Sequence, residues 1–349
     1  MDTGSPQNLL NVSGVDYSPD MTEMMVEDFP SATDPYRREL LAHCYRMLGS
    51  VHDAEDLVQE TYLRAWKAYD RFEGRSSLRT WLHKIATTAC LTALESRGRR
   101  PLPTGLGGPS STPEETLVER TEVPWLEPLP DVMIGADATD GADPATVVTS
   151  RESVRLALVA ALQHLPPRQR AVLILRDVLR WRAAEVAEAV GISTAAVNSI
   201  LQRARAQLEK VAPSAETVSE PATAEQRALL DRYVTAFENY DVSALVTLFT
   251  DDAVWEMPPF PTWYTGPETI GRLIAAQCPA QRAGDLKLVP TRANGQPAYG
   301  MYLLDADAGV YRAFGIHVVT LSGDAVAHVA VFFDTALFAD FDLPETIAA

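Results

Sequence analysis

The stretch AAEVAEAVGISTAAVNSILQ (residues 183–202) has the spacing of a helix-turn-helix. Ala187 is small where two helices must cross closely, and Gly191 can adopt the positive φ of the turn between them. Val197 is apolar where the second helix packs back on the first. Three further apolar positions complete a small core: Val186, Ile192 and Ile200. The pattern predicts a DNA-reading unit. The alternative is an ordinary helical hairpin, because Ala-rich helices around a glycine are common.

The second helix of this motif would place its N-terminal turn in a major groove. Ser193 or Thr194 can cap that helix. Asn and Gln side chains can read adenine edges, whereas Arg side chains mostly position a protein on the phosphates. Just upstream, LPPRQRAVL (165–173) starts another helix with proline in its first turn. The residues predicted to contact DNA here are Arg168, Ser193, Thr194, Asn198, Ser199, Gln202, Arg203 and Arg205.

Charge is distributed unevenly along the chain. The formal net charge is −17, yet residues 35–101 carry +4 and residues 151–210 carry +5. The other segments are acidic, with −7 in 1–34, −8 in 102–150 and −11 in 211–349. DNA is a polyanion and would be attracted only to the two basic segments. The charge map therefore predicts a protein that binds DNA at two points.

Length and composition set the broad class of protein. The chain has 349 residues, of which 46% are hydrophobic, enough for two or three domains with cores of their own. No apolar run reaches 18 residues, so we expect no membrane span. Cys44, Cys90 and Cys278 are far apart and lack CxxC spacing, which disfavours disulfides and a zinc site and fits a reducing cytoplasm. We expect no metal and no cofactor.

Changes in composition divide the chain into successive units. Residues 1–34 have the composition of a disordered acidic tail rather than of a signal peptide. Residues 35–101 and 151–211 have helical periodicity. Residues 102–150 form an acidic, proline-rich linker whose composition cannot compensate the entropy that would be lost on ordering. After a short linker at 212–222, the last unit spans 223–342. It opens with a helical stripe and then contains strand-like runs at Lys287–Arg292, Ala298–Leu304, Val310–Leu321 and Ala325–Asp334.

Aromatic and basic residues surround a loop in the first basic segment. The loop FEGRSSL (72–78) precedes a helix with Trp81 near its start. Single-stranded DNA needs a stacking platform and neutralisation of its backbone, and this loop offers both kinds of residue. The alternatives are that Trp81 belongs to the core and that the neighbouring polar face is simply solvated.

Two stretches of this segment and one of the second basic segment resemble a known family. DAEDLVQETYLRAW (53–66) and RSSLRTWLHKIATTACLTALESRGRR (75–100) are similar to region 2 of sigma-70 factors of the extracytoplasmic-function (ECF) group. LPPRQRAVLILRDVLRWRAAEVAEAVGISTAAVNSILQRARAQL (165–208) is similar to their region 4. The resemblance implies an alternative sigma factor that brings core RNA polymerase to promoter DNA and contacts its clamp and flap. It assigns polymerase binding to Leu57, Gln59, Glu60, Arg64 and Trp66.

The same resemblance divides the DNA contacts between two promoter elements. Residues 193–205 would read the minus-thirty-five element, and the acidic linker lies where family members thread a segment toward the active centre. That linker would either mimic nucleic acid or act as a plain tether. The chain departs from the family at Thr88 and Thr92, where Asn and Asp are frequent, and at Asn198, where Lys or Arg is frequent. The residues assigned to the minus-ten element are Arg75, Ser76, Ser77, Trp81, Lys84 and Thr88.

The last unit resembles a second family. RALLDRYVTAFENYDVSALVTLFTDDAVWEMPPFPTWYTGPETIGRLI (227–274), with the strand-rich run after it, is similar to the SnoaL-like branch of the nuclear-transport-factor-2-like superfamily. Together with regions 2 and 4, this resembles ECF factors of the SigG and SigJ type. The resemblance implies a multidomain protein with two all-α sigma modules and an α+β cone around an apolar pocket. Candidate pocket residues are Trp255, Met257, Trp263, Tyr264, Tyr302, His317, Phe332 and Asp334.

Three roles for the last unit follow from these patterns. It would act as an interaction or autoregulatory module, as a ligand sensor, or as a SnoaL-type enzyme with a DNA-binding extension. We expect no enzymatic activity, because no pair of catalytic side chains has diagnostic spacing. For the whole chain, the alternative to a sigma factor is a helix-turn-helix regulator with a ligand-sensing domain. The similarity to region 2 argues against this alternative, since an ordinary repressor needs no clamp-binding helix.

Overall fold

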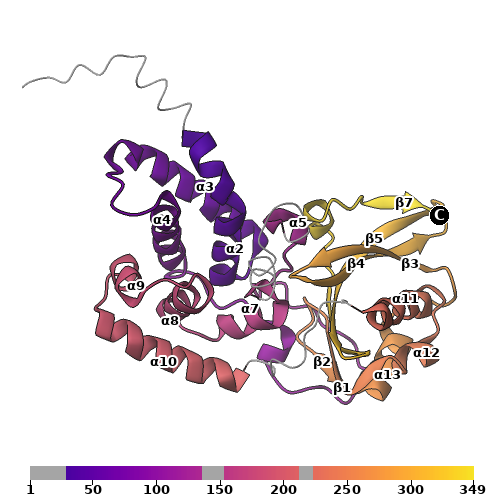
Figure 1. Cartoon of the computed structure of the whole chain (residues 1–349). Coiled ribbons are helices and arrows are strands. Elements are labelled where there is room, and N and C mark those ends of the chain that lie inside the picture. Colours follow the sequence, from indigo (N-terminus) through magenta and orange to yellow (C-terminus); the bar gives the residue numbers. More distant parts are fainter. Residues whose placement is uncertain (1–28, 136–152, 212–222) are drawn as a thin grey trace, which may run out of the picture.

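The computed structural model describes residues 29–135, 153–211 and 223–349. Figure 1 shows a helical part on the left and a curved sheet with its own helices on the right. The first helical unit is a three-helix bundle in which Gly49, with φ of +74°, ends the first helix. Its helices are α2 (Arg37–Leu48), α3 (Val51–Ala68) and α4 (Leu78–Ala93), with short 3-10 turns η1 (Asp34–Tyr36) and η2 (Tyr69–Arg71).

The second helical unit contains the expected helix-turn-helix. Val186 and Val197 are fully buried between its helices, and Gly191 ends the first of them with φ of +70°. These features confirm the turn predicted from the spacing. The elements of the unit are α7 (Leu156–Gln163), α8 (Pro167–Leu173), the π-type turn η4 (Ile174–Val178), α9 (Ala183–Val190) and α10 (Thr194–Val211).

The C-terminal unit is an α+β domain with a sheet of order β2-β1-β6-β5-β4-β3, and β7 pairs with β5. All pairs are antiparallel except β1 with β6. The helices are α11 (Ala224–Glu238), α12 (Val242–Val246), α13 (Pro267–Gln277) and α14 (Leu337–Asp340). The strands are β1 (Phe249–Glu256), β2 (Trp263–Thr265), β3 (Leu286–Ala293), β4 (Gln296–Asp305), β5 (Val310–Ser322), β6 (Ala325–Phe332) and β7 (Thr346–Ala348).

The two faces of the sheet belong to different hydrophobic cores. Side chains alternate along a strand, so that on β5 Val319 packs toward α11 and α13, whereas Ile316 and Val318 face the other way. The second face joins a core that also contains Leu40 and Leu82 of the first helical unit. The helical part and the C-terminal domain therefore share one continuous core. The burial of apolar surface holds them together.

Part of the expected linker lies along the C-terminal domain. Residues 101–135 contain the short helices η3 (Pro103–Gly105) and α5 (Asp131–Ile134), and Leu126 and Leu129 are fully buried. The segment does not order itself. It packs against both neighbouring units, and these contacts compensate the conformational entropy that is lost when the segment becomes ordered. The rest of the expected linker, residues 136–150, lies outside the described residues, as does the whole of the short linker at 212–222.

Two expected boundaries differ from the structure. Residues 29–33 are helical rather than part of a disordered tail, because Phe29 is buried and its ring lies 5.0 Å from that of Tyr69. The sheet also extends beyond residue 342, since β7 pairs with β5. Residues 1–28 of the expected tail lie outside the described residues. No helix within the described ranges is long and apolar enough to cross a membrane.

Candidate polymerase and nucleic-acid interfaces

An exposed apolar patch lies on α3, the helix expected to bind polymerase. Ser50 caps this helix by accepting a hydrogen bond from the Asp53 amide at 3.1 Å. Trp66 is 50% exposed and Leu63 is 53% exposed. Large apolar side chains with this exposure are typical of a protein-binding surface. Leu63 was not among the residues predicted from the sequence, although it lies one turn from Trp66 in the same helical stripe.

The other predicted polymerase contacts on α3 differ in availability. Gln59 is exposed. Glu60 and Arg64 form an ion pair at 2.7 Å, one turn apart. Leu57 is partly buried against the core, which leaves little of its side chain for a partner.

The loop before α4 rests on an aromatic cluster. The ring of Trp81 lies 4.9 Å from that of Phe72 and 6.5 Å from that of Tyr69, and Trp81 is partly buried. Its primary contacts are therefore packing contacts that support the loop, as the alternative interpretation held. Arg75, Ser76 and Ser77 are exposed on the loop, and the Ser77 hydroxyl caps α4 by accepting from the Thr80 amide.

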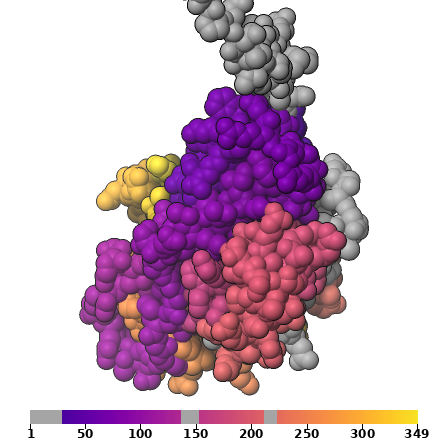
Figure 2. All heavy atoms as spheres, turned by 90° about the vertical axis from the view of Figure 1, so that its left-hand side faces the viewer, coloured from indigo at the N-terminus to yellow at the C-terminus, as the bar shows by residue number. Residues whose placement is uncertain are grey.

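The predicted minus-ten surface of α4 faces the helix-turn-helix. Lys84 Nζ lies 2.7 Å from the Glu188 carboxylate on α9, and this partner lowers the pKa of Glu188. One turn away, Thr88 is exposed and donates its hydroxyl hydrogen to the Lys84 carbonyl. The ring of His83 lies 6.2 Å from that of Trp181, which is buried just before α9. Figure 2 shows residues 183–211 directly below the surface of the first helical unit.

The recognition helix α10 presents its predicted DNA contacts outward. The Ser193 hydroxyl accepts from the Ala196 amide at 3.2 Å and caps this helix. Arg205 makes two contacts with Asp177 of η4, at 2.6 and 2.9 Å, so that a phosphate would have to compete with this carboxylate. Arg168, on α8, is exposed. The remaining predicted residues are exposed along α10: Thr194, Asn198, Ser199, Gln202 and Arg203.

A buried junction that sequence reasoning missed joins all three units. Asn294, in the turn between β3 and β4, is fully buried with φ of +57°. Its amide nitrogen donates to the Tyr45 hydroxyl on α2 at 2.8 Å and to the Val154 carbonyl at 2.7 Å. Its side-chain oxygen accepts from the Leu129 amide at 2.9 Å. Asn-Gly at 294–295 is a strong signal for a tight turn, but not for docking of that turn elsewhere.

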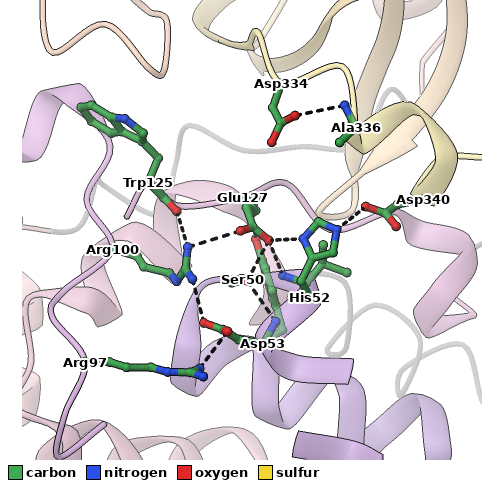
Figure 3. A network of polar contacts seen from close by, with 12 residues as sticks. Ser50, His52, Asp53, Arg97, Arg100, Trp125, Glu127, Asp334, Ala336 and Asp340 are labelled. Atoms are coloured by element: carbon green, nitrogen blue, oxygen red, sulfur yellow. Dashed lines mark hydrogen bonds and ion pairs between the residues drawn. The ribbon is translucent and has the colours of Figure 1, made fainter. Parts of the chain in front are cut away.

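A second polar network lies close by (Figure 3). The Glu127 carboxylate accepts from the Ser50 hydroxyl at 2.8 Å and from the Val51 amide at 2.9 Å. Arg100 pairs with Glu127 at 3.3 Å and with Asp53 at 2.7 Å. These contacts fasten the linker to the start of α3 and to the basic end of the first helical unit.

His52 extends this network to the C-terminal domain. Its ring nitrogens lie 3.1 Å from Glu127 and 3.3 Å from Asp340 on α14. Burial lowers the pKa of His52, but the hydrogen bond and charge of Glu127, with the charge of Asp340, raise it overall. Protonation of His52 therefore strengthens its link between the linker and the C-terminal domain.

The C-terminal domain encloses an apolar cavity of about 350 Å³ between α13 and the sheet. Trp255, Met257 and His317 line it, as expected. His317 is fully buried, which lowers its pKa to about 3 and keeps the imidazole neutral. Its Nδ1 lies 3.1 Å from the Tyr233 hydroxyl. Most of the lining is aromatic or aliphatic: Phe237, Phe260, Leu273, Ile274, Met301, Phe314, Val331 and Phe333.

Five of the expected pocket residues do not line this cavity. Trp263 donates its indole hydrogen to the Gly107 carbonyl on the linker. Tyr264 is buried in the core, and Asp334 is exposed and accepts from the Ala336 amide. Tyr302 and Phe332 face the core shared with the helical part. They alternate with Met301 and Val331, which do line the cavity, so Tyr302 and Phe332 lie on the opposite face of the sheet.

The fold and these surfaces define a class of protein. One unit has an exposed apolar helix patch and a basic loop, another has a helix-turn-helix with its recognition helix exposed, and a cone-shaped domain is docked on both. This combination is that of a transcription factor with two DNA-binding modules and an additional α+β domain.

Comparison with known proteins gives the family. Residues 33–100 match the model of Sigma-70 region 2, residues 155–208 that of Sigma-70 region 4, and residues 230–329 that of the SnoaL-like domain. The ECF RNA polymerase sigma factor SigG of Mycobacterium tuberculosis is 62% identical over 321 residues, which is 92% of this chain and 85% of SigG. The chain therefore belongs to the ECF RNA polymerase sigma factors.

A second factor from Mycobacterium tuberculosis extends the comparison. SigJ is 31% identical over 225 residues, covering 64% of this chain and 63% of SigJ. The crystal structure of SigJ aligns with a TM-score of 0.57 at 23% identity, over 91% of this chain and 100% of the crystallised chain. This chain and SigJ thus share a fold over most of their length.

Proposed function

We propose that this ECF sigma factor is autoregulated, and that its C-terminal domain and linker hold the two sigma units in a closed arrangement. Core RNA polymerase binds through α3, and promoter DNA is read by α4 and α10. The factor acts beside its polymerase in the cytoplasm. The observation that carries this proposal is the contact between α4 and α9, in which Lys84 pairs with Glu188.

The spacing of the two promoter elements supports the proposal that this arrangement of the sigma units is closed. The minus-ten and minus-thirty-five elements are about 25 base pairs apart, which is on the order of 80 Å along the DNA axis. Two units in direct contact cannot reach both elements at once. Lys84, one of the predicted minus-ten contacts, is also occupied by a carboxylate. Promoter binding therefore requires the units to separate.

The junction around Asn294 supports a role for the C-terminal domain in this closure. It links α2, the linker and Val154, two residues before α7, through buried hydrogen bonds. The continuous core adds apolar contacts on the same face of the sheet. Charge acts in the same direction, since the C-terminal segment 211–349 carries −11 and the two sigma units are basic.

The chemistry of the cavity favours ligand binding over catalysis. A general base is most effective when its pKa is near the working pH, but burial lowers the pKa of His317 to about 3. Asp252 and His328, two other titratable residues of the domain, line a separate cleft between the sheet and α7. We propose that the domain is not an enzyme in this protein.

Truncation to residues 1–211 tests the autoregulation. We expect the fragment to bind core RNA polymerase at least tenfold more tightly than the full chain at matched salt. The reason is that only the open form binds, so the apparent affinity for core polymerase is lower when a smaller fraction of the factor is open. Circular dichroism of the fragment checks that its helices remain folded. If the fragment and the full chain bind with equal affinity, the C-terminal domain does not restrain polymerase binding.

A further inference from the structure

His52 lies where three parts of the chain meet. It is the second residue of α3, and its ring lies between the linker and the C-terminal domain (Figure 3). Nδ1 lies 3.1 Å from Glu127 Oε2 of the linker, and Nε2 lies 3.3 Å from Asp340 Oδ2 of α14. Two carboxylates from different parts of the chain therefore face the two nitrogens of one ring. We call these three side chains the His52 bridge.

The protonation of the ring decides whether both contacts of the bridge are favourable. A neutral imidazole carries one N–H, and its other nitrogen presents a lone pair. In that form one of the two carboxylates faces a lone pair, and the contact is repulsive. The imidazolium carries two N–H groups and can donate to Glu127 and to Asp340 at the same time. A proton on His52 therefore joins the linker and the C-terminal domain to α3.

The two carboxylates differ in how much they depend on this proton. Glu127 Oε2 also accepts from the Ser50 hydroxyl and from the Val51 amide, and Glu127 Oε1 pairs with Arg100 at 3.3 Å. Asp340 Oδ2 is buried and has no hydrogen-bond partner among the described residues. Its ion pair with His52 therefore compensates the cost of burying this oxygen.

The charged groups around the bridge are mostly acidic. Burial lowers the pKa of His52, but the neighbouring carboxylates outweigh burial and raise that pKa above its ordinary 6.5. Asp53 lies in the same network, where Arg97 and Arg100 pair with it. The charged groups that act on His52 or on its partners come from all the parts that meet here: Glu55 on α3, Arg100 after α4, Glu127 in the linker, and Asp334 and Asp340 in the C-terminal domain.

We propose that the His52 bridge makes docking of the C-terminal domain sensitive to pH, so that the closed factor binds a proton that the open factor releases. The inference rests on the proposed autoregulation. A group whose pKa is raised by docking stabilises the docked state fully below the pKa of the undocked group. This stabilisation is lost as the pH rises through the raised pKa. Between about pH 6 and 8, acidification therefore favours the closed factor and alkalinisation favours the open one.

The size of the effect follows from exposure. The His52 side chain is 53% exposed, so solvent screens both ion pairs and the expected effect is modest. The bridge lies at the start of α3, the helix with the exposed apolar patch at Leu63 and Trp66. Four other histidines titrate at lower pH, because burial lowers their pKa: His43, His83, His164 and His317.

The first test follows the His52 ring by NMR. The full chain is labelled with carbon-13 in its histidines and titrated without polymerase, so the result does not depend on the proposed function. Loss of one of the six histidine signals in His52→Gln identifies the residue. We expect a pKa above 6.5 for His52 in the wild type. Asp340→Asn should lower that pKa by about 0.5 or more, which is about a threefold loss of proton affinity.

The matched control is Asp342→Asn. Asp342 is exposed and lies two residues beyond Asp340, so its substitution should leave the pKa of His52 unchanged. A His52 pKa of 6.5 or lower in the wild type would overturn the bridge. So would a pKa that Asp340→Asn does not change in a folded protein.

A second test measures the affinity of the full chain for core RNA polymerase at about pH 6.5 and pH 8.0. We expect the wild type to gain about twofold more affinity over this range than His52→Gln, which lacks the titrating group. The comparison removes the pH response of the polymerase itself. An equal response in both proteins, together with a His52 pKa that depends on Asp340, would keep the proton site and contradict the proposed autoregulation.

Discussion

Replacing Asn294 by glycine is expected to raise the affinity of the full chain for core RNA polymerase at least tenfold. Glycine accepts the positive φ at this position, so the turn between β3 and β4 stays intact. The substitution removes three side-chain hydrogen bonds and leaves buried partners on α2, on the linker and before α7 unpaired. Each such loss costs about 1–3 kcal/mol. A tenfold change requires only about 1.4 kcal/mol.

The control for this variant is Asp342→Gly. Asp342 also has a positive φ, of +55°, but it lies in an exposed turn away from the junction. Polymerase affinity is measured by titrating labelled factor with core enzyme, and thermal unfolding is followed for both variants. An Asn294→Gly protein that is folded and binds no more tightly than Asp342→Gly would show that the junction does not restrain the factor.

Loss of the apolar patch on α3 is expected to have the opposite effect. Trp66→Ala should weaken binding to core polymerase at least thirtyfold, because a buried aromatic side chain at an interface typically contributes about 2 kcal/mol or more. Leu63→Ala should weaken it about fivefold to tenfold, in keeping with a smaller buried side chain. Both residues are about half exposed in the free chain, so their removal leaves the fold intact.

The linker supplies a matched control for the smaller substitution. Leu106 is 46% exposed and lies in the linker rather than on α3, so Leu106→Ala should leave polymerase affinity unchanged. The measurement is the dissociation constant for core enzyme at constant salt. Wild-type affinity in Trp66→Ala would place the polymerase-binding surface somewhere other than α3.

Local features of the fold could be predicted from the sequence. The helix-turn-helix follows from the spacing of Ala187, Gly191 and Val197, because each position meets a steric requirement set within about ten residues. Strand positions followed from β-branched runs and from the turn at Gly323, which has φ of +59°. The pocket residues were harder to assign, since both faces of the sheet are apolar and neighbouring residues such as Met301 and Tyr302 belong to different cores.

Contacts between units could not be predicted in the same way. Nothing in the composition of residues 102–135 indicates that they order, because their partners are supplied by distant segments. Lys84 and Arg205 were expected to face DNA, yet each is paired with a carboxylate whose position depends on packing. The role of Asn294 likewise depends on the docking of a turn against α2. Docking of this kind leaves no periodic signal in the sequence.

The distance between the two sigma units tests the closed arrangement most directly. Fluorescent labels at Thr92→Cys on α4 and Ala184→Cys on α9, in a Cys278→Ser background, occupy exposed positions on the two helices that are in contact. Cys44 and Cys90 are buried and remain unlabelled. We predict high energy transfer in the free factor and a large loss of transfer when core RNA polymerase is added. Low transfer in the free factor, or transfer that core polymerase does not change, would contradict a closed state that opens on binding.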